Sequence, residues 1–343
     1  MGGSKNVFAS VKSYSKRGKL LKNSDFQTLA ESRDLDELMT RIKNTIYGDA
    51  VSDVSKPYTS HGIENALRSN LAEQHHSISK TTGSKVLDAY YLKFIISNLK
   101  QILKGKVLGK SQEEIESHIN LRAEELIKER DIVVKALLAK DLEEAVVSLN
   151  QVEFGDEITK AAALYEEKKN IQIFDTYFDK ILFTRLVKAL KSGDIDASKL
   201  IVMDIDFYNI LSVVRGKFWE LEEQQIQDLI LPQSSAAREL LGRMISASSI
   251  KDAFNELSNT KYKNLIPSVE NELDALAEFE RSFELAIYAA SLNSFTKMFS
   301  LVTSVGITKL TAYEVRNIAA IAYAIEQKIP TETTMSKLIL KTE

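Results

Sequence analysis

The stretch DLDELMTRIKNTIYGD at residues 34–49 recurs twice along the chain, as DLEEAVVSLNQVEFGD at residues 141–156 and as SIKDAFNELSNTKYKN at residues 249–264. Aligning Leu35, Leu142 and Ile250 places the copies 107 and 108 residues apart. A self-similar segment at a regular interval indicates an internally repeated fold. This interval is too long for a solenoid unit, which is a single supersecondary motif, so we expect repeated domains.

Each copy carries the apolar stripe of a short amphipathic helix. The residues three, four and seven positions after the aligned one are apolar: Leu38, Met39 and Ile42; Ala145, Val146 and Leu149; Ala253, Phe254 and Leu257. Asp34, Asp141 and Ser249 stand where the N-caps of these helices belong. An aromatic residue follows twelve positions after the aligned one, where we expect it to pack back onto the helix end. The three aromatic residues are Tyr47, Phe154 and Tyr262.

A second marker centres on Asn98, Asn209 and Asn317, which are 111 and 108 residues apart. The residues one, four and five positions later are again apolar: Leu99, Ile102 and Leu103; Ile210, Val213 and Val214; Ile318, Ile321 and Ala322. Asparagine is a poor residue for a helix interior, so its recurrence indicates a side-chain hydrogen bond to the backbone of a neighbouring helix. We therefore interpret these asparagines as structural residues and not as ligand contacts.

The markers predict an all-α chain with three similar helical domains. A third, looser helical pattern lies between them and begins near Glu64, Asp175 and Glu280. Strand alternation and hairpin turns are nearly absent, and the 13 glycines and 4 prolines make up about 5% of the 343 residues, against about 12% in average proteins. Three like domains can follow one another in an open chain or close around a pseudo-threefold axis.

The predicted boundaries follow from the repeat. They are an N-terminal helix at 1–24 and repeat domains at 25–130, 131–240 and 241–343, the last with a short polar tail after Pro330. Charged stretches at 112–130 and 221–228 are predicted to be links between the domains, the first being an insertion. The first 24 residues are basic and lack the apolar core of a secretory signal. Apolar residues at helical spacing favour a docked first helix there over an organelle transit peptide.

Composition excludes several classes of protein. The chain has 45 Lys and Arg against 48 Asp and Glu, a balance that argues against a nucleic-acid partner. Because it has no cysteine, disulfide scaffolds and cysteine-ligated metal sites are excluded. The longest apolar run, residues 318–325, is far shorter than the ~20 residues that cross a bilayer.

Two stretches resemble nucleotide or metal sites. GKVLGKS at residues 105–111 is one residue short of a phosphate-binding P-loop and follows a predicted helix instead of a strand, so we interpret it as a helix end and loop. Asp204 and Asp206 have the spacing of an acidic metal pair, but the first copy has Lys93 and Ile95 at those positions. We predict that Asp204 instead caps the helix of Asn209.

No residues are predicted to be catalytic, to bind a cofactor or to bind a metal. The four histidines, His61, His75, His76 and His118, lack the spacing of a zinc site, because adjacent histidines point to different faces of a helix. The G-x-S-x-G motif of a hydrolase nucleophile does not occur.

Taken together, the repeats resemble a known family. The segments TIYG at 45–48, FDTYFDKILF at 174–183, DFYNILSVVRGKFW at 206–219 and YEVRNIAAIAYAI at 313–325 are similar in order and spacing to the C subunit of archaeal A-type ATP synthases. That C subunit is the counterpart of the d subunit of vacuolar-type rotary ATPases. The resemblance covers nearly the whole chain. It implies a funnel-shaped, all-helical subunit of three similar domains in a pseudo-threefold arrangement.

The resemblance also implies a function and partners. It implies a non-catalytic central-stalk subunit of a proton-translocating synthase, bound to the membrane proteolipid ring and to the central shaft, which transmits torque for ATP synthesis. Its expected location is peripheral, at the cytoplasmic face of the cell membrane. Two alternatives remain: a helical scaffold for soluble partners without membrane association, and a helical enzyme that uses Asp204 and Asp206.

Overall fold

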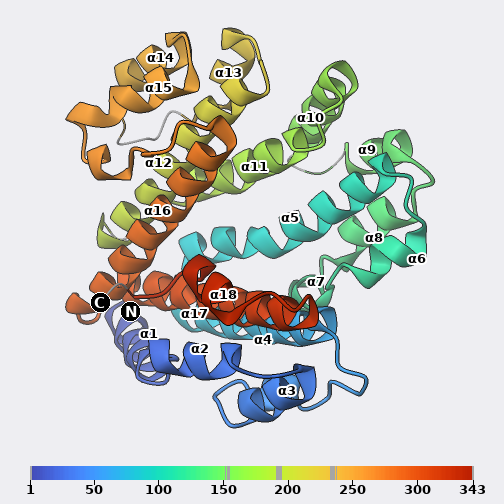
Figure 1. Cartoon of the computed structure of the whole chain (residues 1–343), viewed down its shortest axis with the longest axis vertical. Helices are drawn as coiled ribbons and strands as arrows, with labels where there is room; N and C mark the ends of the chain where they lie inside the picture. The colour runs from blue at the N-terminus through green and yellow to red at the C-terminus, as the bar shows by residue number, and fades with distance from the viewer. Residues whose placement is uncertain are drawn as a thin grey trace. The chain divides into compact units, whose positions relative to one another are not determined.

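Eighteen α-helices and four short 3-10 turns make up the regular structure of the described residues in the computed structural model (Figure 1). The described residues are 2–150, 152, 155–190, 195–231, 236 and 238–341. None of them belongs to a strand, so the predicted all-α class is confirmed. Among them, no helix combines the length and the apolar character that a bilayer crossing requires.

The elements have the following bounds. In chain order the α-helices are α1 (Gly2–Arg17), α2 (Asn23–Ala30), α3 (Leu35–Lys43), α4 (Ser60–Thr82), α5 (Lys85–Val107), α6 (Gln112–Ser117), α7 (Arg122–Ile127), α8 (Arg130–Leu138), α9 (Leu142–Leu149), α10 (Gly155–Lys168), α11 (Ile173–Leu190), α12 (Ile195–Phe218), α13 (Glu223–Leu229), α14 (Arg238–Ser246), α15 (Ile250–Asn255), α16 (Glu272–Asn293), α17 (Leu301–Glu326) and α18 (Thr331–Lys337). The 3-10 turns are η1 (Asp49–Val51), η2 (Glu256–Asn259), η3 (Lys263–Leu265) and η4 (Ser294–Thr296).

The repeat is more extensive in the structure than in the sequence. Helices α2, α8 and α14 each begin twelve residues before the aligned residue of their copy. Helices α6, α13 and α18 each begin fourteen residues after the asparagine of their copy. The three copies therefore share their helices in the same order, with α7 and α10 as additions.

The stretches predicted to be charged links and a polar tail contain short helices. Residues 112–130 contain α6 and α7, residues 221–228 lie largely in α13, and the tail contains α18. Each of these helices has only six or seven residues, which is too short to show an apolar stripe. Helix α6 buries a single side chain, Ile115, and helix α18 also buries only one, Thr334.

Hydrogen bonds at the N-caps set the start of the repeated amphipathic helices α3, α9 and α15. In each cap the side-chain oxygen accepts from the backbone N–H three residues later, at 2.8, 2.9 and 3.0 Å respectively. Such a bond satisfies one of the donors that a helix start leaves free. The predicted N-caps Asp34, Asp141 and Ser249 are thus confirmed.

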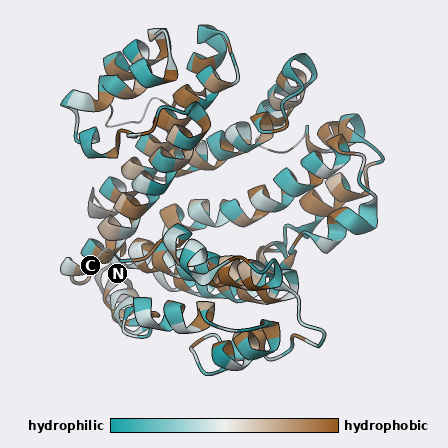
Figure 2. Cartoon of the chain, in the orientation of Figure 1, coloured by the Kyte–Doolittle hydropathy of each residue, from teal (hydrophilic) through white to brown (hydrophobic). Residues whose placement is uncertain are grey.

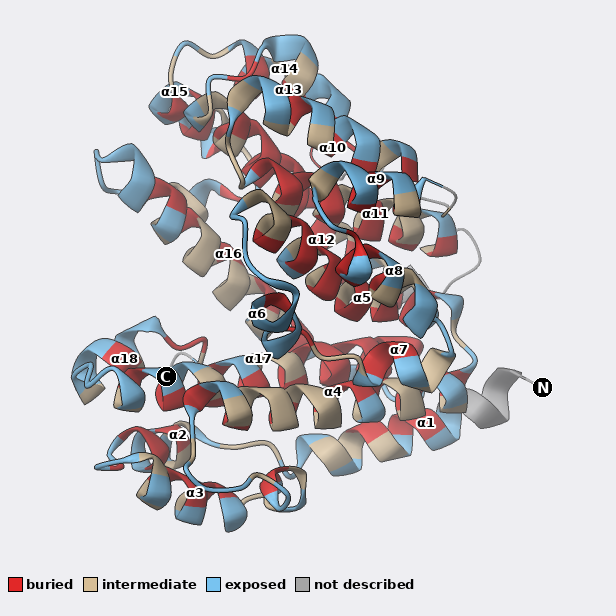
Figure 3. Ribbon diagram, turned by 90° about the vertical axis from the view of Figure 1, so that its right-hand side faces the viewer, coloured by how far each residue is buried: buried red, intermediate tan, exposed pale blue. Residues whose placement is uncertain are grey.

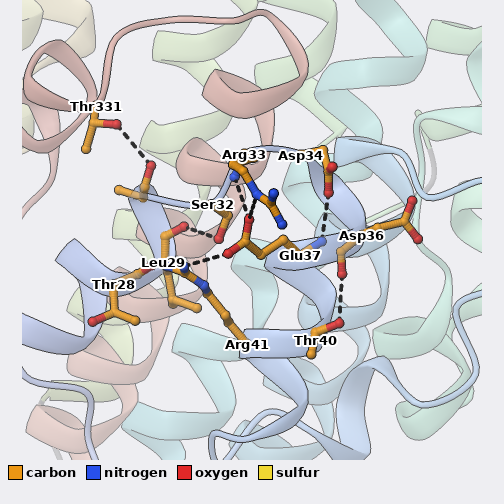
Figure 4. A network of polar contacts seen from close by, with 11 residues as sticks. Thr28, Leu29, Ser32, Arg33, Asp34, Asp36, Glu37, Thr40, Arg41 and Thr331 are labelled. Carbon is orange, nitrogen blue, oxygen red and sulfur yellow. Dashed lines mark hydrogen bonds and ion pairs between the residues drawn. The ribbon is translucent and has the colours of Figure 1, made fainter.

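Close to the first of these caps, Arg41 of α3 donates to the Thr28 carbonyl of α2 (Figure 4). Glu37 accepts from Arg33 Nε at 2.8 Å and from Arg41 Nη2 at 2.7 Å. The hydrogen bond from Arg33 is the main cause that lowers the pKa of Glu37 to about 2. Thr331, at the start of α18, donates to the Ala30 carbonyl at 3.2 Å, so the last helix of the chain contacts the end of α2.

The chain divides into two compact units. The first comprises Met1–Phe94, Asn120–Lys128 and Tyr288–Glu343, and the second comprises Ile95–Ile119 and Glu129–Ile287. Brown and teal residues are interleaved along the helices of both (Figure 2), as expected of amphipathic helices that bury one face. The three-domain, pseudo-threefold arrangement stays a prediction.

Helix α17 lies at the centre of the first unit, where α1, α2 and α4 pack against it. Most of its length is buried (Figure 3). Ile318 and Ile321 belong to one core cluster with Leu38, Ile42 and Tyr47, so the last long helix and the first repeat share a core.

Helix α1 docks on α17, as predicted for the N-terminal segment. The hydroxyl of Ser10 lies 3.2 Å from that of Thr303, and the hydroxyl of Ser13 lies 3.2 Å from that of Ser304. All four side chains are buried, and their small size lets the two helices approach closely.

In the second unit, aromatic rings fill the space between α12, α15 and α16. Phe207 stacks on Phe283 with ring centroids 4.8 Å apart, and Phe254 lies 5.1 Å from Phe279. Tyr262 contacts Phe283 at 5.0 Å. The aromatic residue that closes the third amphipathic helix is therefore part of the core of this unit.

Glycines in α5 and α12 make room for the short helix that follows each of them. A Cβ on Gly105 would lie 2.5 Å from Ile115 Cγ1, and a Cβ on Gly216 would lie 2.7 Å from Ile226 Cγ1. Both distances are far below van der Waals contact. The third copy carries Ala324 and Thr334 at the corresponding sequence positions.

We expect Gly216→Ala to lower the free energy of unfolding by about 1 kcal/mol, because overpacking against Ile226 costs more than the helix propensity of alanine returns. The matched control is Gly242→Ala in α14, where nothing lies within 4 Å of the new Cβ. The control should leave stability unchanged or raise it in urea unfolding. Equal effects of the two substitutions would contradict the close contact between α12 and α13.

Candidate functional site

Two of the three repeated asparagines each bind both backbone groups of one residue in a later segment. Asn209 Nδ2 donates to the Leu231 carbonyl at 2.9 Å, and Leu231 N–H donates to Asn209 Oδ1 at 2.9 Å. Asn317 makes the same pair of bonds with Ile339, at 2.8 and 3.1 Å. In both copies the partner is 22 residues later, and both asparagines are at most 3% exposed.

These bonds support the structural interpretation but differ from it in one respect. Leu231 and Ile339 follow the short helices α13 and α18 and are not helical themselves, so the bonds do not go to a helix backbone. An amide side chain suits this place because it offers one donor and one acceptor to a backbone without regular partners. Asn98 is buried at the equivalent position of α5, and its structural role stays a prediction.

The aromatic residues of two copies each bind a buried carboxylate on a long helix of another copy. Tyr47 Oη donates to Glu314 Oε2 at 2.6 Å, and Tyr262 Oη donates to Asp206 Oδ2. Each carboxylate stands three residues before the asparagine of its helix. Both rings are buried, at 1% and 4% exposed, as their predicted packing onto the helix end requires.

The two carboxylates also accept from equivalent backbone groups. Leu21 N–H donates to Glu314 Oε1, and Ala236 N–H donates to Asp206 Oδ1 at 3.2 Å. Leu21 and Ala236 each precede the first helix of their copy by two residues. Asp206 has a further partner in Lys261, whose Nζ lies 3.1 Å from Oδ2.

Phe154, the third predicted aromatic residue, lies outside the described residues. Its predicted position at the end of the second amphipathic helix therefore stays a prediction. Ile95 occupies the carboxylate position of the first copy. Neither the Phe154 nor the Ile95 side chain has a polar atom. Where the aromatic residue lacks a hydroxyl, the carboxylate position is therefore apolar as well.

These two carboxylates were not predicted as partners of the aromatic residues. The signal was an acidic residue three positions before the asparagine in two copies, together with a tyrosine at the aromatic position in two copies. Burial raises the pKa of the Glu314 carboxyl to about 7 and the pKa of the Tyr47 hydroxyl well above its usual range. Both groups therefore favour their neutral forms within this contact.

The structure corrects the interpretation of Asp204. Helix α12 begins nine residues earlier, at Ile195, so Asp204 is buried within the helix and does not cap it. Asp206 is occupied by Tyr262, Lys261 and a backbone N–H. In the part of the chain that the structure describes, no three His, Asp or Glu side chains gather as a metal site would require.

The P-loop-like stretch at residues 105–111 is a helix end and a loop, as interpreted from the sequence. Gly105 lies within α5 and faces Ile115. Gly109 has a φ of 65°, a left-handed conformation that suits glycine. Ser111 caps α6 by accepting from the Glu114 N–H at 3.2 Å. None of these positions forms a loop of N–H groups between a strand and a helix.

His75 is the most isolated of the histidines. It is 1% exposed, and neither ring nitrogen has a hydrogen-bond partner. Its ring centroid lies 5.4 to 5.8 Å from those of Tyr90, Tyr91 and Phe94. Burial, with nearby Lys93 and His76, holds the pKa of His75 well below its usual value of 6.5.

We expect His75→Leu to remove an acid sensitivity of the fold. In the wild type, the unfolded chain binds a proton at this histidine below pH 6.5 while the folded chain does not, so stability falls as the pH falls. Relative to the wild type, the variant should gain up to about 1.4 kcal/mol per pH unit below pH 6.5. The control is His61→Leu, at an exposed position, and urea unfolding at several pH values should show no such gain for it. Parallel curves of stability against pH for the wild type and His75→Leu would contradict a buried neutral histidine.

These features define a class of protein: an all-helical chain with three copies of one helix order, in which buried polar side chains join different copies. Residues 9–337 match the family described as ATP synthase (C/AC39) subunit. The chain therefore belongs to this family. The prediction that it is a subunit of an ATP synthase is confirmed.

Relatives of this chain include the C subunits of A-type ATP synthases from several archaea. The one from Methanocaldococcus jannaschii is 24% identical over 97% of this chain and 86% of its own length. The one from Pyrococcus horikoshii is 24% identical, with 92% and 85% covered. The one from Haloferax volcanii is 25% identical, with 81% of each chain covered.

Proposed function

We propose that this chain is the non-catalytic central-stalk subunit of a proton-translocating A-type ATP synthase. In this role it joins the membrane proteolipid ring to the central shaft and transmits torque between them for ATP synthesis. Membership in a family of ATP synthase subunits supports the assignment, as do relatives named as C subunits of A-type ATP synthases over most of the chain. The subunit would lie peripherally at the cytoplasmic face of the cell membrane and need no cofactor.

The role is suited to three similar domains arranged in a funnel around a pseudo-threefold axis. The observation that carries this proposal is the repeated contact between a tyrosine and a carboxylate. It joins the second copy to the third through Asp206 and Tyr262, and the third copy to the first through Glu314 and Tyr47. A contact that returns from the last copy to the first supports a closed order, because a heterologous interface that rotates by one third of a turn closes.

Torque transmission also requires a stiff connector. Buried polar side chains whose hydrogen bonds are satisfied fix one arrangement of the elements that they join. Asn209 and Asn317 each tie a long helix to the segment after a short one, and the tyrosine contacts tie successive copies. A subunit held in this way can transmit force without chemistry of its own.

Reconstitution of the synthase in vesicles tests this function. Without this chain, the headpiece should still hydrolyse ATP, but ATP-driven acidification of the vesicles should be lost, and addition of the purified chain should restore it. Acidification that continues without the chain would contradict the coupling role. Binding of the chain to soluble proteins alone would favour the alternative, a helical scaffold.

The partner surfaces are proposed to follow the repeat. If the shaft enters an opening on the pseudo-axis, its contacts come from equivalent places in all three copies. Alanine substitutions in one copy should then weaken shaft binding only in part, as measured by titration of the purified shaft subunits. Loss of all affinity from a single copy would contradict the socket arrangement.

A further inference from the structure

A cavity of about 560 Å³ in the first unit has a basic lining that the proposed function does not explain. It is bounded by the end of α1, the segment between α3 and η1, and side chains of α4 and α17. The charged residues of its lining are Lys16, Lys19, Lys43 and Asp49, so it has an excess of two positive charges. Its volume is within the usual range of small-ligand sites.

The lysines of this cavity have no carboxylate partners among the described residues. Lys16 Nζ donates to Gln74 Oε1 at 2.9 Å, a neutral acceptor. Half-buried Lys16 has a lowered pKa because burial removes water from its ammonium group, and Lys12 and Lys19 add repulsion. In the same unit, Arg33 and Arg41 both bind Glu37.

The lysine set also belongs to one copy only. The second and third copies carry Asn150 and Ser258 at the position of Lys43. Lys16 and Lys19 lie in a segment that precedes the first repeat and has no equivalent in the others. The positive charge is therefore not required by the repeated fold, whose other two copies form without it.

We propose that this cavity binds a small anion through a phosphate group. A phosphate group carries a charge of about −1.5 to −2 at neutral pH, which matches the excess of two positive charges. Lysine ammonium groups bind phosphate as point charges, and charge-assisted hydrogen bonds are the strong ones. Lys16 from α1 and Lys43 from the end of α3 approach such a group from separate elements, so its binding would also join α1 to the first repeat.

Thermal unfolding of the purified full chain tests the proposal. The melting temperature is measured at increasing concentrations of inorganic phosphate. Sodium chloride keeps the ionic strength constant, so that charge screening is the same in every sample. A bound anion stabilises the folded state by mass action. The melting temperature of the wild type should rise by a few degrees at saturating phosphate, whereas that of Lys16→Gln and of Lys43→Gln should rise little or not at all.

The matched control is Lys337→Gln, which removes the same charge at an exposed position of α18 in the same unit. It should keep the wild-type response to phosphate. No rise in the wild type with phosphate, pyrophosphate or ATP, or an equal rise in Lys16→Gln and Lys43→Gln, would overturn the proposal. A response to ATP alone would identify a nucleotide as the source of the phosphate group, and a response to all three would identify a phosphate site without nucleotide selectivity. These outcomes do not depend on the role of the chain in the synthase.

Discussion

Replacing Asn209 with leucine is expected to lower the free energy of unfolding by about 3 kcal/mol, because it leaves two buried backbone groups without partners. The N–H and the carbonyl of Leu231 both bind the Asn209 side chain, which is fully buried. Leucine has nearly the same size but neither donates nor accepts. The loss should appear as a lower urea midpoint with an unchanged slope.

Two further variants sharpen this test. Asn317→Leu removes the same pair of bonds in the third copy and should destabilise the chain by a similar amount. Asn293→Leu, at an exposed position of α16, should have little effect. If Asn209→Leu kept its stability but lost assembly into the synthase, the residue would be a partner contact and the structural interpretation would be wrong.

Replacing Glu314 with glutamine is expected to change the pH dependence of stability. Burial raises the pKa of Glu314 from 4.5 to about 7, so the folded chain holds a proton that the unfolded chain releases between these values. The corresponding stability is complete below pH 4.5 and is lost as the pH rises through 7. The full loss is about 3 kcal/mol, given about 1.4 kcal/mol for each pH unit between the two pKa values.

Glutamine is uncharged at every pH, as the protonated acid is, and its oxygen can accept from Leu21 N–H or from Tyr47 Oη. Compared with Glu314→Gln, the wild type should therefore lose stability between about pH 4.5 and 8, as measured by urea unfolding at each pH. Glu332→Gln, an exposed site in the same unit, is the control and should follow the wild type. Parallel curves for the wild type and Glu314→Gln would contradict a buried neutral carboxyl.

The repeat could be predicted from sequence because it rests on periodic burial. The structure buries both sets of apolar stripes, which are periodic over two turns or more. One set follows Leu35, Leu142 and Ile250, and the other follows the three asparagines. The N-caps could also be predicted, because an Asp or Ser immediately before an apolar stripe has a local physical role. The family resemblance added the function, which no pattern of burial contains.

The parts that escaped prediction depend on contacts between distant segments. Helices α6, α13 and α18 are too short to show a period, and α6 and α13 lie close against Gly105 and Gly216 of the long helices before them. Asp206 and Glu314 bind tyrosines that are 56 and 267 residues away, so only the folded chain shows that they are partners. Asp204 was misplaced because α12 begins nine residues before it, at Ile195.

The most direct test of the proposed function is purification of the tagged chain from membranes solubilised in mild detergent, with the bound chains identified by mass and quantified. The rotor assignment predicts that a small proteolipid and subunits of the ATPase headpiece bind together in fixed proportion. Recovery of soluble partners only, or of none, from intact membranes would contradict it and favour the scaffold.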